Sequence, residues 1–332
     1  MRRVTAQDDD LGTTGRGDRL ASVAVTTMLL DAASLYFRAF YGVPTSVTSP
    51  DGRPVNAVRG FLDMTARLVT AHRPERLVAC WDDDWRPAFR VAALPSYKAH
   101  RLAPDGGEET PPELGPQVPV LVEVLAAAGI ERVGAPGYEA DDVIGTLATR
   151  ARGPVDVVTG DRDLFQLVDD ARGIRVLYTA RGIGDIEVVD EAGVAARYGI
   201  PGRAYADFAV LRGDPSDGLP GVAGVGAKTA AALVTAFGHL DGIRAAAARA
   251  VVPKPPLTAA VLKKLHAAAE YLDAAPVVVA VERAIDLPPV DGALPRRPAD
   301  PGTLAGLADQ HNLLSPLRRL GAALGWPEDA LS

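Results

Sequence analysis

The sequence predicts an α/β fold, with a mostly parallel central sheet flanked by helices and a smaller helical region after it. Short β-branched apolar runs alternate with helical stretches over the first 200 residues, a spacing typical of parallel βαβ units. Beyond about residue 200 the strand signals thin out and alanine-rich helical patterns take over. We therefore place a domain change near residues 195–205, with a core over 21–200 and a helical region over 201–322.

The first elements follow one another regularly. Residues 1–20 are polar and contain several glycines, so we expect a mobile leader there. The run 22–30 predicts a buried strand because it is short, apolar and β-branched. Helices are expected over 32–40 and 56–70, separated by a loop rich in proline and glycine, and a second strand is expected over 76–81.

Residues 83–117 differ in amino-acid composition from the segments before them. A basic part carries Lys98 and Arg101, and a part rich in glycine and proline follows it, so we expect a short mobile flap. Order resumes with predicted helices over 117–128 and 138–150 and with predicted strands over 154–159 and 175–178.

Composition restricts the class of protein. The chain has 332 residues, of which 48% are hydrophobic and 23% charged, which favours a packed core over disorder. The single cysteine, Cys80, excludes an internal disulfide and fits a reducing compartment, so we expect a cytoplasmic protein. No apolar run reaches the roughly 18 residues of a membrane span, and the N-terminus lacks the apolar stretch of a secretory signal. Taken alone, the net charge of −7 argues against nucleic acid as a partner.

Acidic residues follow three of the predicted strands. Asp31 and Asp82 come directly after the first two, and Asp161 and Asp163 follow the third. A single aspartate in this position usually caps a helix or begins a turn. Three strands of an open α/β sheet, however, deliver their ends to one edge, where ligands bind. These residues are therefore expected to converge on one site.

Two further groups of carboxylates belong with this set. Glu139, Asp141 and Asp142 open the helix near residue 138, which one favourable helix dipole does not require. Their mutual repulsion would raise their pKa values unless a cation lies among them. Asp214 and Asp217 lie in a loop, where an Asx turn is an equally good interpretation.

The nine carboxylates together indicate hard cations. The set includes no histidine or cysteine, and all-oxygen ligation suits Mg²⁺ or Mn²⁺. Nine are too many for one ion but suit two ions about 3.5–4 Å apart, the arrangement used for attack at phosphorus. The candidate ligands are Asp31, Asp82, Glu139, Asp141, Asp142, Asp161, Asp163, Asp214 and Asp217.

A glycine-containing turn directly follows the last of these carboxylates. Gly224 and Gly226 precede Lys228 and Thr229 at the start of an alanine-rich helix. Free N–H groups at a helix start bind anions, and the glycines allow close approach. The turn could be only a tight turn or part of a dinucleotide site, but no strand precedes it. As a helix–hairpin–helix it would hold a DNA backbone without reading sequence.

Basic and aromatic residues supply further candidates. Tyr97 could stack on a base, while Lys98 and Arg101 could neutralise a phosphate. Arg38, seven residues past Asp31, could do the same. Exposed basic residues on a flexible segment are an equally good interpretation of all four.

These motifs resemble the prokaryotic 5′ nucleases of the flap-endonuclease superfamily. The chain is similar to the 5′-nuclease domain of bacterial DNA polymerase I and to phage 5′–3′ exonucleases over roughly residues 22–322. The resemblance rests on Leu30-Asp31 with Arg38, Trp81-Asp82, Tyr97-Lys98 with Arg101, the run 137–143, the run 159–167 and the run 213–229. Gly218 stands where the family usually has asparagine. No polymerase follows, so we expect a stand-alone nuclease.

The resemblance implies a PIN-like nuclease core with a short arch over 83–117 and a helical hairpin region. It implies 5′–3′ exonuclease and flap-endonuclease activity on DNA with 5′ flaps, nicks, gaps or free 5′ ends, in replication and repair, by a monomer. Glu139, Asp141, Asp161 and Asp163 would bind one metal, and Asp142, Asp214 and Asp217 the second. Asp31 and Asp82 would bind the ions or their waters, and Lys98 and Arg101 would orient the phosphate. The hairpin would hold duplex DNA, in family members often with a K⁺ ion.

Three rival functions fit the sequence less well. A non-catalytic binder of branched DNA would use the hairpin alone, and nine clustered carboxylates would then only repel DNA. A haloacid-dehalogenase-type phosphatase needs a second aspartate where Ala33 stands, and a small RNA nuclease lacks a hairpin region. Setting the nine carboxylates aside changes the net charge from −7 to +2, so the acidic total no longer counts against DNA.

Overall fold

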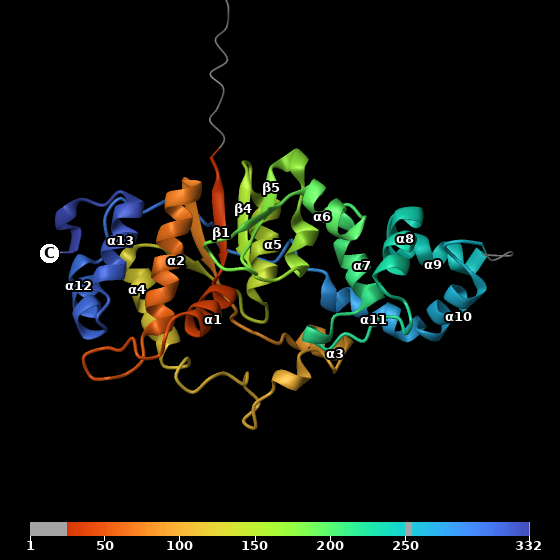
Figure 1. Ribbon diagram of the computed structural model, residues 1–332, viewed down its shortest axis with the longest axis horizontal. Helices are drawn as coiled ribbons and strands as arrows, with labels where there is room; N and C mark the ends of the chain where they lie inside the picture. The colour runs from red at the N-terminus through yellow and green to blue at the C-terminus, as the bar shows by residue number, and fades with distance from the viewer. Residues whose placement is uncertain (1–24, 250–253, 332) are drawn as a thin grey trace, which may run out of the picture.

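A six-stranded sheet forms the centre of the molecule. The computed structural model describes residues 25–249 and 254–331, so the leader expected over 1–20 lies outside the described residues. The strand order is β3-β2-β1-β4-β5-β6, with β1 to β5 parallel and β6 antiparallel to β5 (Figure 1). The strands are β1 (Thr27–Asp31), β2 (Arg76–Cys80), β3 (Glu131–Val133), β4 (Val155–Thr159), β5 (Ile174–Tyr178) and β6 (Glu187–Val189).

The predicted α/β fold class is confirmed. Of the four predicted strands, β2, β4 and β5 begin and end within one residue of the prediction. The end of β1 also lies within one residue of the prediction, but β1 begins at Thr27 and not at residue 22. The two strands that were not predicted, β3 and β6, have three residues each. Runs of three residues are too short to show the alternation that identifies a strand in a sequence.

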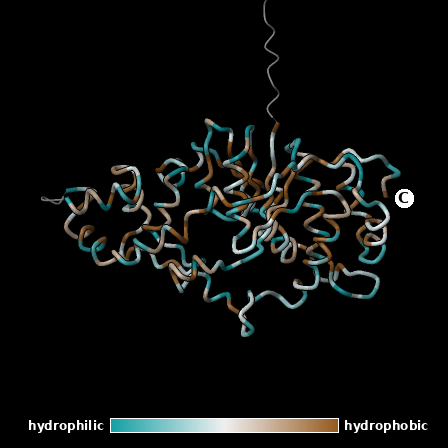
Figure 2. Tube along the Cα trace, turned by 180° about the vertical axis from the view of Figure 1, so that it is seen from behind, coloured by the Kyte–Doolittle hydropathy of each residue, from teal (hydrophilic) through white to brown (hydrophobic). Residues whose placement is uncertain are grey.

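Helices cover both faces of the sheet because both faces are apolar. Met28 and Leu30 pack into one layer of the core, and Leu29 between them packs into the other, as the two-residue repeat of a strand requires. The first face is covered by α2 (Asn56–His72) and α4 (Gln117–Ala128), and the second by α5 (Ala140–Arg150). Hydrophobic residues are accordingly concentrated around the strands (Figure 2).

The chain reverses direction across the sheet at β1. From β1 it passes through α1 (Ala32–Gly42) and α2 to β2 on one side, whereas β4 lies on the other side of β1. The connections that follow β1 and β4 therefore diverge and leave open space beyond the carboxyl ends of these two strands. Ligand sites of open α/β sheets lie at such points.

Beyond β6 the chain is mostly helical and extends to one side of the sheet (Figure 1). This region includes α6 (Glu191–Tyr198), α7 (Tyr205–Arg212), α8 (Ala227–Phe237), α9 (Leu240–Arg249), α10 (Ala259–Ala267) and α11 (Ala269–Val279). Two last helices, α12 (Pro301–Gln310) and α13 (Leu314–Leu324), return to the opposite side and pack with α2 and α4. None of the helices in the described ranges is long and apolar enough to cross a membrane.

The segment between β2 and α4 contains little regular structure. It includes the short helix α3 (Ala88–Ala93) and a turn of 3₁₀ helix over Ala99–Arg101, and a bridge between Leu102 and Glu108 closes a small loop. The segment runs along the side of the molecule below the sheet (Figure 1).

The packing of α13 on α2 gives a test of how much the C-terminal helices stabilise the core. Leu317 is fully buried in the layer shared with α2, so we expect Leu317→Ala to lower the free energy of unfolding by about 2–5 kcal/mol through the cavity it leaves. Chemical denaturation measures this. Arg318→Ala, at the exposed neighbour, should change it by less than about 0.5 kcal/mol. Equal values for the two variants would contradict the assignment of α13 to the core.

Candidate active site

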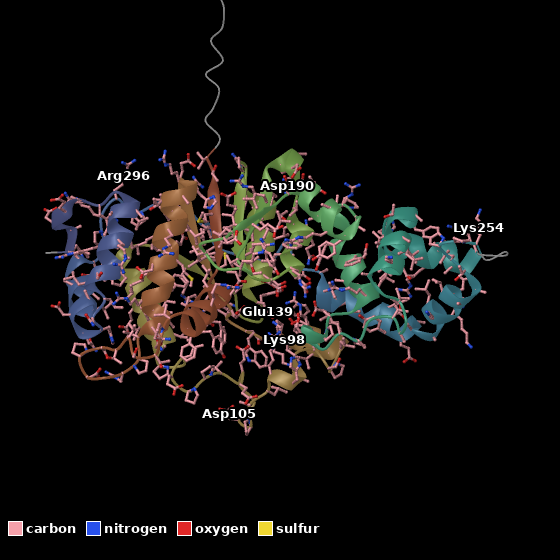
Figure 3. All side chains as sticks on the ribbon, in the orientation of Figure 1. Lys98, Asp105, Glu139, Asp190, Lys254 and Arg296 are labelled. Carbon is pink, nitrogen blue, oxygen red and sulfur yellow. The ribbon has the colours of Figure 1, made fainter. Side chains whose placement is uncertain are left out.

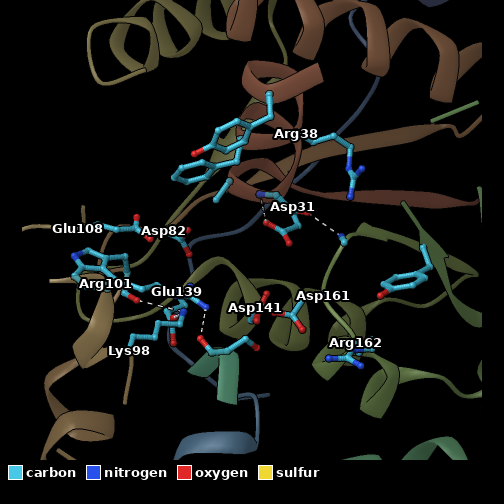
Figure 4. A pocket seen from close by; sticks show the side chains of 18 of the residues that line it. Asp31, Arg38, Asp82, Lys98, Arg101, Glu108, Glu139, Asp141, Asp161 and Arg162 are labelled. Carbon is cyan, nitrogen blue, oxygen red and sulfur yellow. Dashed lines mark hydrogen bonds and ion pairs between the residues drawn. The ribbon is translucent and has the colours of Figure 1, made fainter. Parts of the chain in front are cut away.

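A cavity of about 910 Å³ opens at the carboxyl ends of the central strands. Its lining includes acidic side chains from six separate segments and basic side chains facing them (Figure 4). Six of the nine predicted carboxylates line it, namely Asp31, Asp82, Glu139, Asp141, Asp161 and Asp214. The sheet thus brings together residues that are far apart in the sequence.

Asp31 and Asp161 lie at the ends of adjacent strands. Asp31 accepts hydrogen bonds from the Ser34 N–H (3.0 Å) and the Thr159 hydroxyl (2.7 Å), so it caps α1 and also joins β1 to β4. Burial, with the charge of Asp161 adding to it, raises the pKa of Asp31 to about 6. Asp31 therefore caps α1 and also lines the cavity, so both interpretations of this residue are correct.

Asp82 and Asp141 approach from the other side of β1. Asp82 accepts a hydrogen bond from the Ala140 N–H (2.6 Å) and so holds the start of α5 against β2. Burial and the nearby charge of Asp31 together raise the pKa of Asp82 to about 7. Burial also raises the pKa of Asp141 well above its usual range, as do the charges of Asp31 and Asp161. The negative charge here is desolvated and incompletely compensated.

Among the nine carboxylates, Asp163 has a buried oxygen that lacks a hydrogen-bond partner in the described residues. It is 8% exposed, and its Oδ1 is buried without a hydrogen-bond partner among the described residues. Burial and the charge of Asp161 raise its pKa well above the usual range. A buried orphan oxygen of this kind is costly unless a cation or a proton reaches it.

Glu139 is held by three donors from the segment after β2. Arg90, the Tyr97 hydroxyl and the Lys98 ammonium all bond to its carboxylate, the Tyr97 contacts being 2.7 and 2.9 Å. Lys98 and Glu139 lie side by side below the sheet (Figure 3). Tyr97 is only 3% exposed and its ring is part of the core, so the ring is not accessible for the base stacking expected of it; its hydroxyl positions Glu139.

Asp142 does not face the cavity. It is completely buried, and both its oxygens bind the guanidinium of Arg90 at 2.7 and 2.8 Å. The Glu139 and Glu282 N–H groups also donate to it. The expectation that Asp142 binds a metal is therefore contradicted by its position: adjacent residues of a helix point about 100° apart, so Asp141 faces the cavity and Asp142 the interior.

Arg90 is the residue that sequence reasoning missed. It is 2% exposed, although it lies in the segment 83–117 for which the sequence predicts a mobile flap, and it joins α3 to α5 through Asp142 and to α11 through the Val278 carbonyl. The available signal was its position within the apolar run Ala88–Ala93.

The loop after α7 closes the cavity from the helical side. Asp214 begins the loop, accepts hydrogen bonds from Ser216 and faces Arg212. Asp217 pairs with Arg101 at 2.9 Å, and burial raises the pKa of Asp217 to about 6. Asp217 also offers its carbonyl to the Lys98 N–H (3.0 Å), so the basic segment and the acidic loop are joined through both backbone and side chains.

Gly218 makes this close approach of the two segments possible. Its φ is +75°, and a Cβ added there would lie 2.2 Å from the Ser96 carbonyl oxygen. The Ser96 hydroxyl donates to the Gly218 carbonyl (2.9 Å). An asparagine at this position would collide with the segment that carries Lys98. The departure of Gly218 from the family pattern therefore has a local structural reason.

Two further side chains complete the rim. Arg38 lines the cavity next to the end of β4, and its Nε is buried with no partner in the described part of the chain. Glu108 adds a carboxylate from the small loop after Lys98. Burial raises its pKa, while the charges of Lys98 and Arg101 oppose this rise.

The donor chemistry of the cavity fits divalent cations. The oxygens that line it are carboxylate oxygens, and several of these carboxyls are desolvated beside one another. Asp163 is not among the lining residues, but it lies beside Asp161 and retains an unpartnered buried oxygen. As the side chains stand, no three acidic, histidine or cysteine groups within the described ranges are arranged around one point. Ion pairs with Lys98, Arg90 and Arg101 hold some of them instead.

The predicted hairpin continues directly from the acidic loop. Val222 and Val225 are buried and anchor the turn, while Gly224, Gly226 and Lys228 are exposed at its tip. Gly224 has a φ of +74°, a conformation that favours glycine, whereas Gly226 is extended and begins α8. Thr229 follows in the first turn of α8, half-buried. The tip thus exposes a helix N-terminus and one lysine.

The buried ion pair under α5 gives a test of the site's foundation. We expect Arg90→Met to lower the free energy of unfolding by about 3–5 kcal/mol, because it leaves the charges of Asp142 and Glu139 buried without their partner. Thermal and chemical denaturation measure this loss. The exposed pair Arg319–Asp63 is the matched control, and Arg319→Met should cost about 0–1 kcal/mol. The double variant Arg90→Met with Asp142→Leu should recover part of the loss, and a loss no smaller than that of Arg90→Met alone would contradict the pairing.

Solved structures of several nucleases share this fold. The chain aligns with the D15 protein of T5, co-crystallised with metal ions, with a TM-score of 0.58 and 16% identity over 90% of this chain and 98% of that one. It aligns with human GEN1 in complex with Holliday junction DNA with a TM-score of 0.58 and 16% identity, over 89% of this chain and 71% of that one. At this identity the likeness concerns the fold.

Bacterial relatives are much more similar in sequence. A 5′-3′ exonuclease of Streptomyces coelicolor is 58% identical over 299 residues, covering 88% of this chain and 98% of that protein. A 5′-3′ exonuclease of Mycobacterium tuberculosis is 52% identical over 90% of this chain and 97% of that protein. DNA polymerase I of Mycobacterium bovis is 44% identical over 222 residues, which is 24% of that longer protein.

Two family models divide the chain between them. Residues 26–199 match the N-terminal resolvase-like domain of 5′-3′ exonucleases, and residues 200–301 match the C-terminal SAM fold of the same proteins. The first match includes the sheet and most of the cavity, and the second includes the acidic loop and the hairpin. With the site and the relatives in agreement, the chain belongs to the 5′-3′ exonuclease family.

Proposed function

We propose that this protein is a structure-specific 5′ nuclease that hydrolyses DNA phosphodiesters with Mg²⁺ or Mn²⁺ bound in the cavity. Its substrates are 5′ flaps, nicks, gaps and free 5′ ends. The observation that carries the proposal is the group of desolvated carboxylates at the ends of β1, β2 and β4, facing Lys98 and Arg101 across one cavity. A cavity that only bound DNA would gain nothing from concentrated negative charge.

The carboxylates would hold two cations in two groups. Asp141, Asp161, Asp163 and Glu139 would hold one ion, and Asp214 and Asp217 the other, with Asp31 and Asp82 binding the ions or their waters. Asp142 is left out because Arg90 neutralises it. When bound, such ions supply a water of lowered pKa and stabilise the charge that develops on the leaving oxygen.

The chain's own cations handle the phosphate. Lys98 is half-buried and pairs with Glu139. This contact and the left-handed backbone of Lys98 (φ 46°) hold its side chain at the mouth of the cavity. Arg101 donates to the Ser216 carbonyl and to Asp217 and keeps donors free for a second acceptor. We infer that both exchange their carboxylate partners for the scissile phosphate when DNA enters, because charge-assisted bonds to phosphate are of similar strength.

The remaining segments supply binding of the strand and the duplex. Residues 83–117 would form the arch that admits a single 5′ strand, with Arg38 binding the phosphate on the opposite rim. The hairpin around Gly224 and Gly226, with Lys228 and Thr229, would hold the duplex through its backbone. The protein would act as a monomer, and its single buried Cys80 suits work on DNA in the cytoplasm.

Replacing Asp163 tests the two-metal proposal. With 5′-labelled flap, nicked and single-stranded DNA, we expect Mg²⁺-dependent release of short 5′ products, and Asp163→Asn should reduce cleavage at least about 1000-fold while duplex binding remains. Asp83→Asn is the matched control, because Asp83 is an exposed neighbour of Asp82 that faces Arg132 outside the cavity. It should cleave like the unaltered protein.

Three outcomes of that experiment would contradict the proposal. Cleavage that persists in EDTA would rule out the dependence on divalent cations. Intact duplex binding without cleavage by the unaltered protein would indicate a non-catalytic binder of branched DNA. Equal loss in Asp163→Asn and Asp83→Asn would show that the cavity is not the catalytic site.

Lys98→Ala separates a catalytic from a binding role for this lysine. Removing a cation that stabilises developing charge should lower the single-turnover cleavage rate by about 100-fold, with less than about threefold weaker DNA binding. Rapid-quench kinetics and fluorescence anisotropy measure the two quantities on the same flap substrate. A loss confined to affinity would reassign Lys98 to positioning of the strand.

A further inference from the structure

The turn of the hairpin already contacts a cation that belongs to the chain. Lys264, on α10 and forty residues beyond the turn, donates a hydrogen bond from its ammonium Nζ to the carbonyl oxygen of Gly224 at 2.8 Å. This is a charge-assisted bond, stronger than a bond between neutral groups. The contact places a full positive charge at the exposed tip, beside the N-terminus of α8.

The close approach depends on the absence of a side chain at Gly224. A Cβ at that position would lie 2.9 Å from the Lys264 Nζ and 3.1 Å from its Cε. The φ of +74° at Gly224 also turns this carbonyl in a direction that other residues rarely allow. A glycine at position 224 therefore allows both the conformation of the turn and the close approach of the Lys264 ammonium.

The helix that carries Lys264 is anchored firmly. Leu262 and Leu265 of α10 are buried in the same core cluster as Val222 and Val225 of the turn. Lys264 is half-buried, whereas Lys263 beside it is exposed and its ammonium makes no hydrogen bond or ion pair with the described residues. The position of the ammonium is thus set by the packing of α10 against the hairpin.

A free monovalent ion does not fit at the Gly224 carbonyl in this arrangement. Potassium ions bind where several carbonyl oxygens replace their water, and at this carbonyl the Lys264 ammonium takes that place. The K⁺ ion expected at the hairpin from the family resemblance is therefore not supported by these residues.

We propose that the Lys264 ammonium is the built-in cation of the hairpin: it holds the Gly224 carbonyl and offers its two other N–H groups to a phosphate of duplex DNA. An ammonium has three donors, of which the carbonyl uses one. The inference rests on the proposed binding of duplex DNA by the hairpin. It makes Lys264 a DNA-binding residue and makes duplex binding independent of K⁺.

Cation exchange tests this inference. Binding of a nicked duplex is measured by fluorescence anisotropy in a cleavage-defective Asp163→Asn background with Mg²⁺, in K⁺, Na⁺ or tetramethylammonium salts of equal ionic strength. We expect equal affinity in the three salts with Lys264 present. Lys264→Met should bind about tenfold more weakly, with the slope of log affinity against log salt reduced by about 0.9. K⁺, but not tetramethylammonium, should restore part of the affinity, because the carbonyl is then open.

Lys263→Met is the matched control, and it should bind like the parent. The inference is overturned if the parent loses affinity when tetramethylammonium replaces K⁺, or if Lys264→Met and Lys263→Met behave alike. It is also overturned if Lys264→Met loses affinity equally in all three salts with a lowered melting temperature, because the loss then reflects damage to the fold. Lys228→Ala separates this from the proposed function: if it too leaves affinity unchanged, the hairpin itself does not bind duplex.

Discussion

The crowding of carboxylates at one edge of the sheet is the constraint on which the rest of the site depends. Since β1, β2 and β4 run parallel, Asp31, Asp82 and Asp161 arrive at the same edge, and the turn at β1 leaves open space between them. Burial makes their charges expensive, which is why the pKa values of Asp31 and Asp82 rise to about 6 and about 7. Every further acidic residue of the site adds to the same cost.

The protein meets this cost in three ways, and the difference separates structural from functional carboxylates. Asp142 has a permanent buried partner in Arg90, so it serves the packing of α3, α5 and α11. Asp31 and Asp82 accept hydrogen bonds from N–H and hydroxyl groups that also fix the ends of α1 and α5. Asp163 retains an oxygen that nothing in the described chain satisfies, and such a group is suited to an added cation.

The cavity belongs to both parts of the chain. The segment with Lys98 and Arg101 is bonded to the loop with Asp214 and Asp217, and that loop leads within a few residues to the hairpin. The proposed phosphate site at Lys98 and the proposed duplex site at the hairpin are therefore connected by one short, bonded segment. The net charge of −7 describes the whole molecule, whereas DNA would meet a rim of arginine and lysine around an acidic interior.

The sequence by itself determined the α/β class, four of the six strands and the carboxylates that follow them, because strand ends, caps and turns are local features of the chain. It also identified the family, because the motifs that identify it consist of residues near one another in the sequence. Only the tertiary structure decided that Asp141 faces the cavity while Asp142 faces Arg90, that Tyr97 is buried, and that Lys264 reaches Gly224. Those contacts join residues 40 to 52 positions apart. Which of two neighbouring acids meets a guanidinium depends on how helices pack, and no local pattern contains that information.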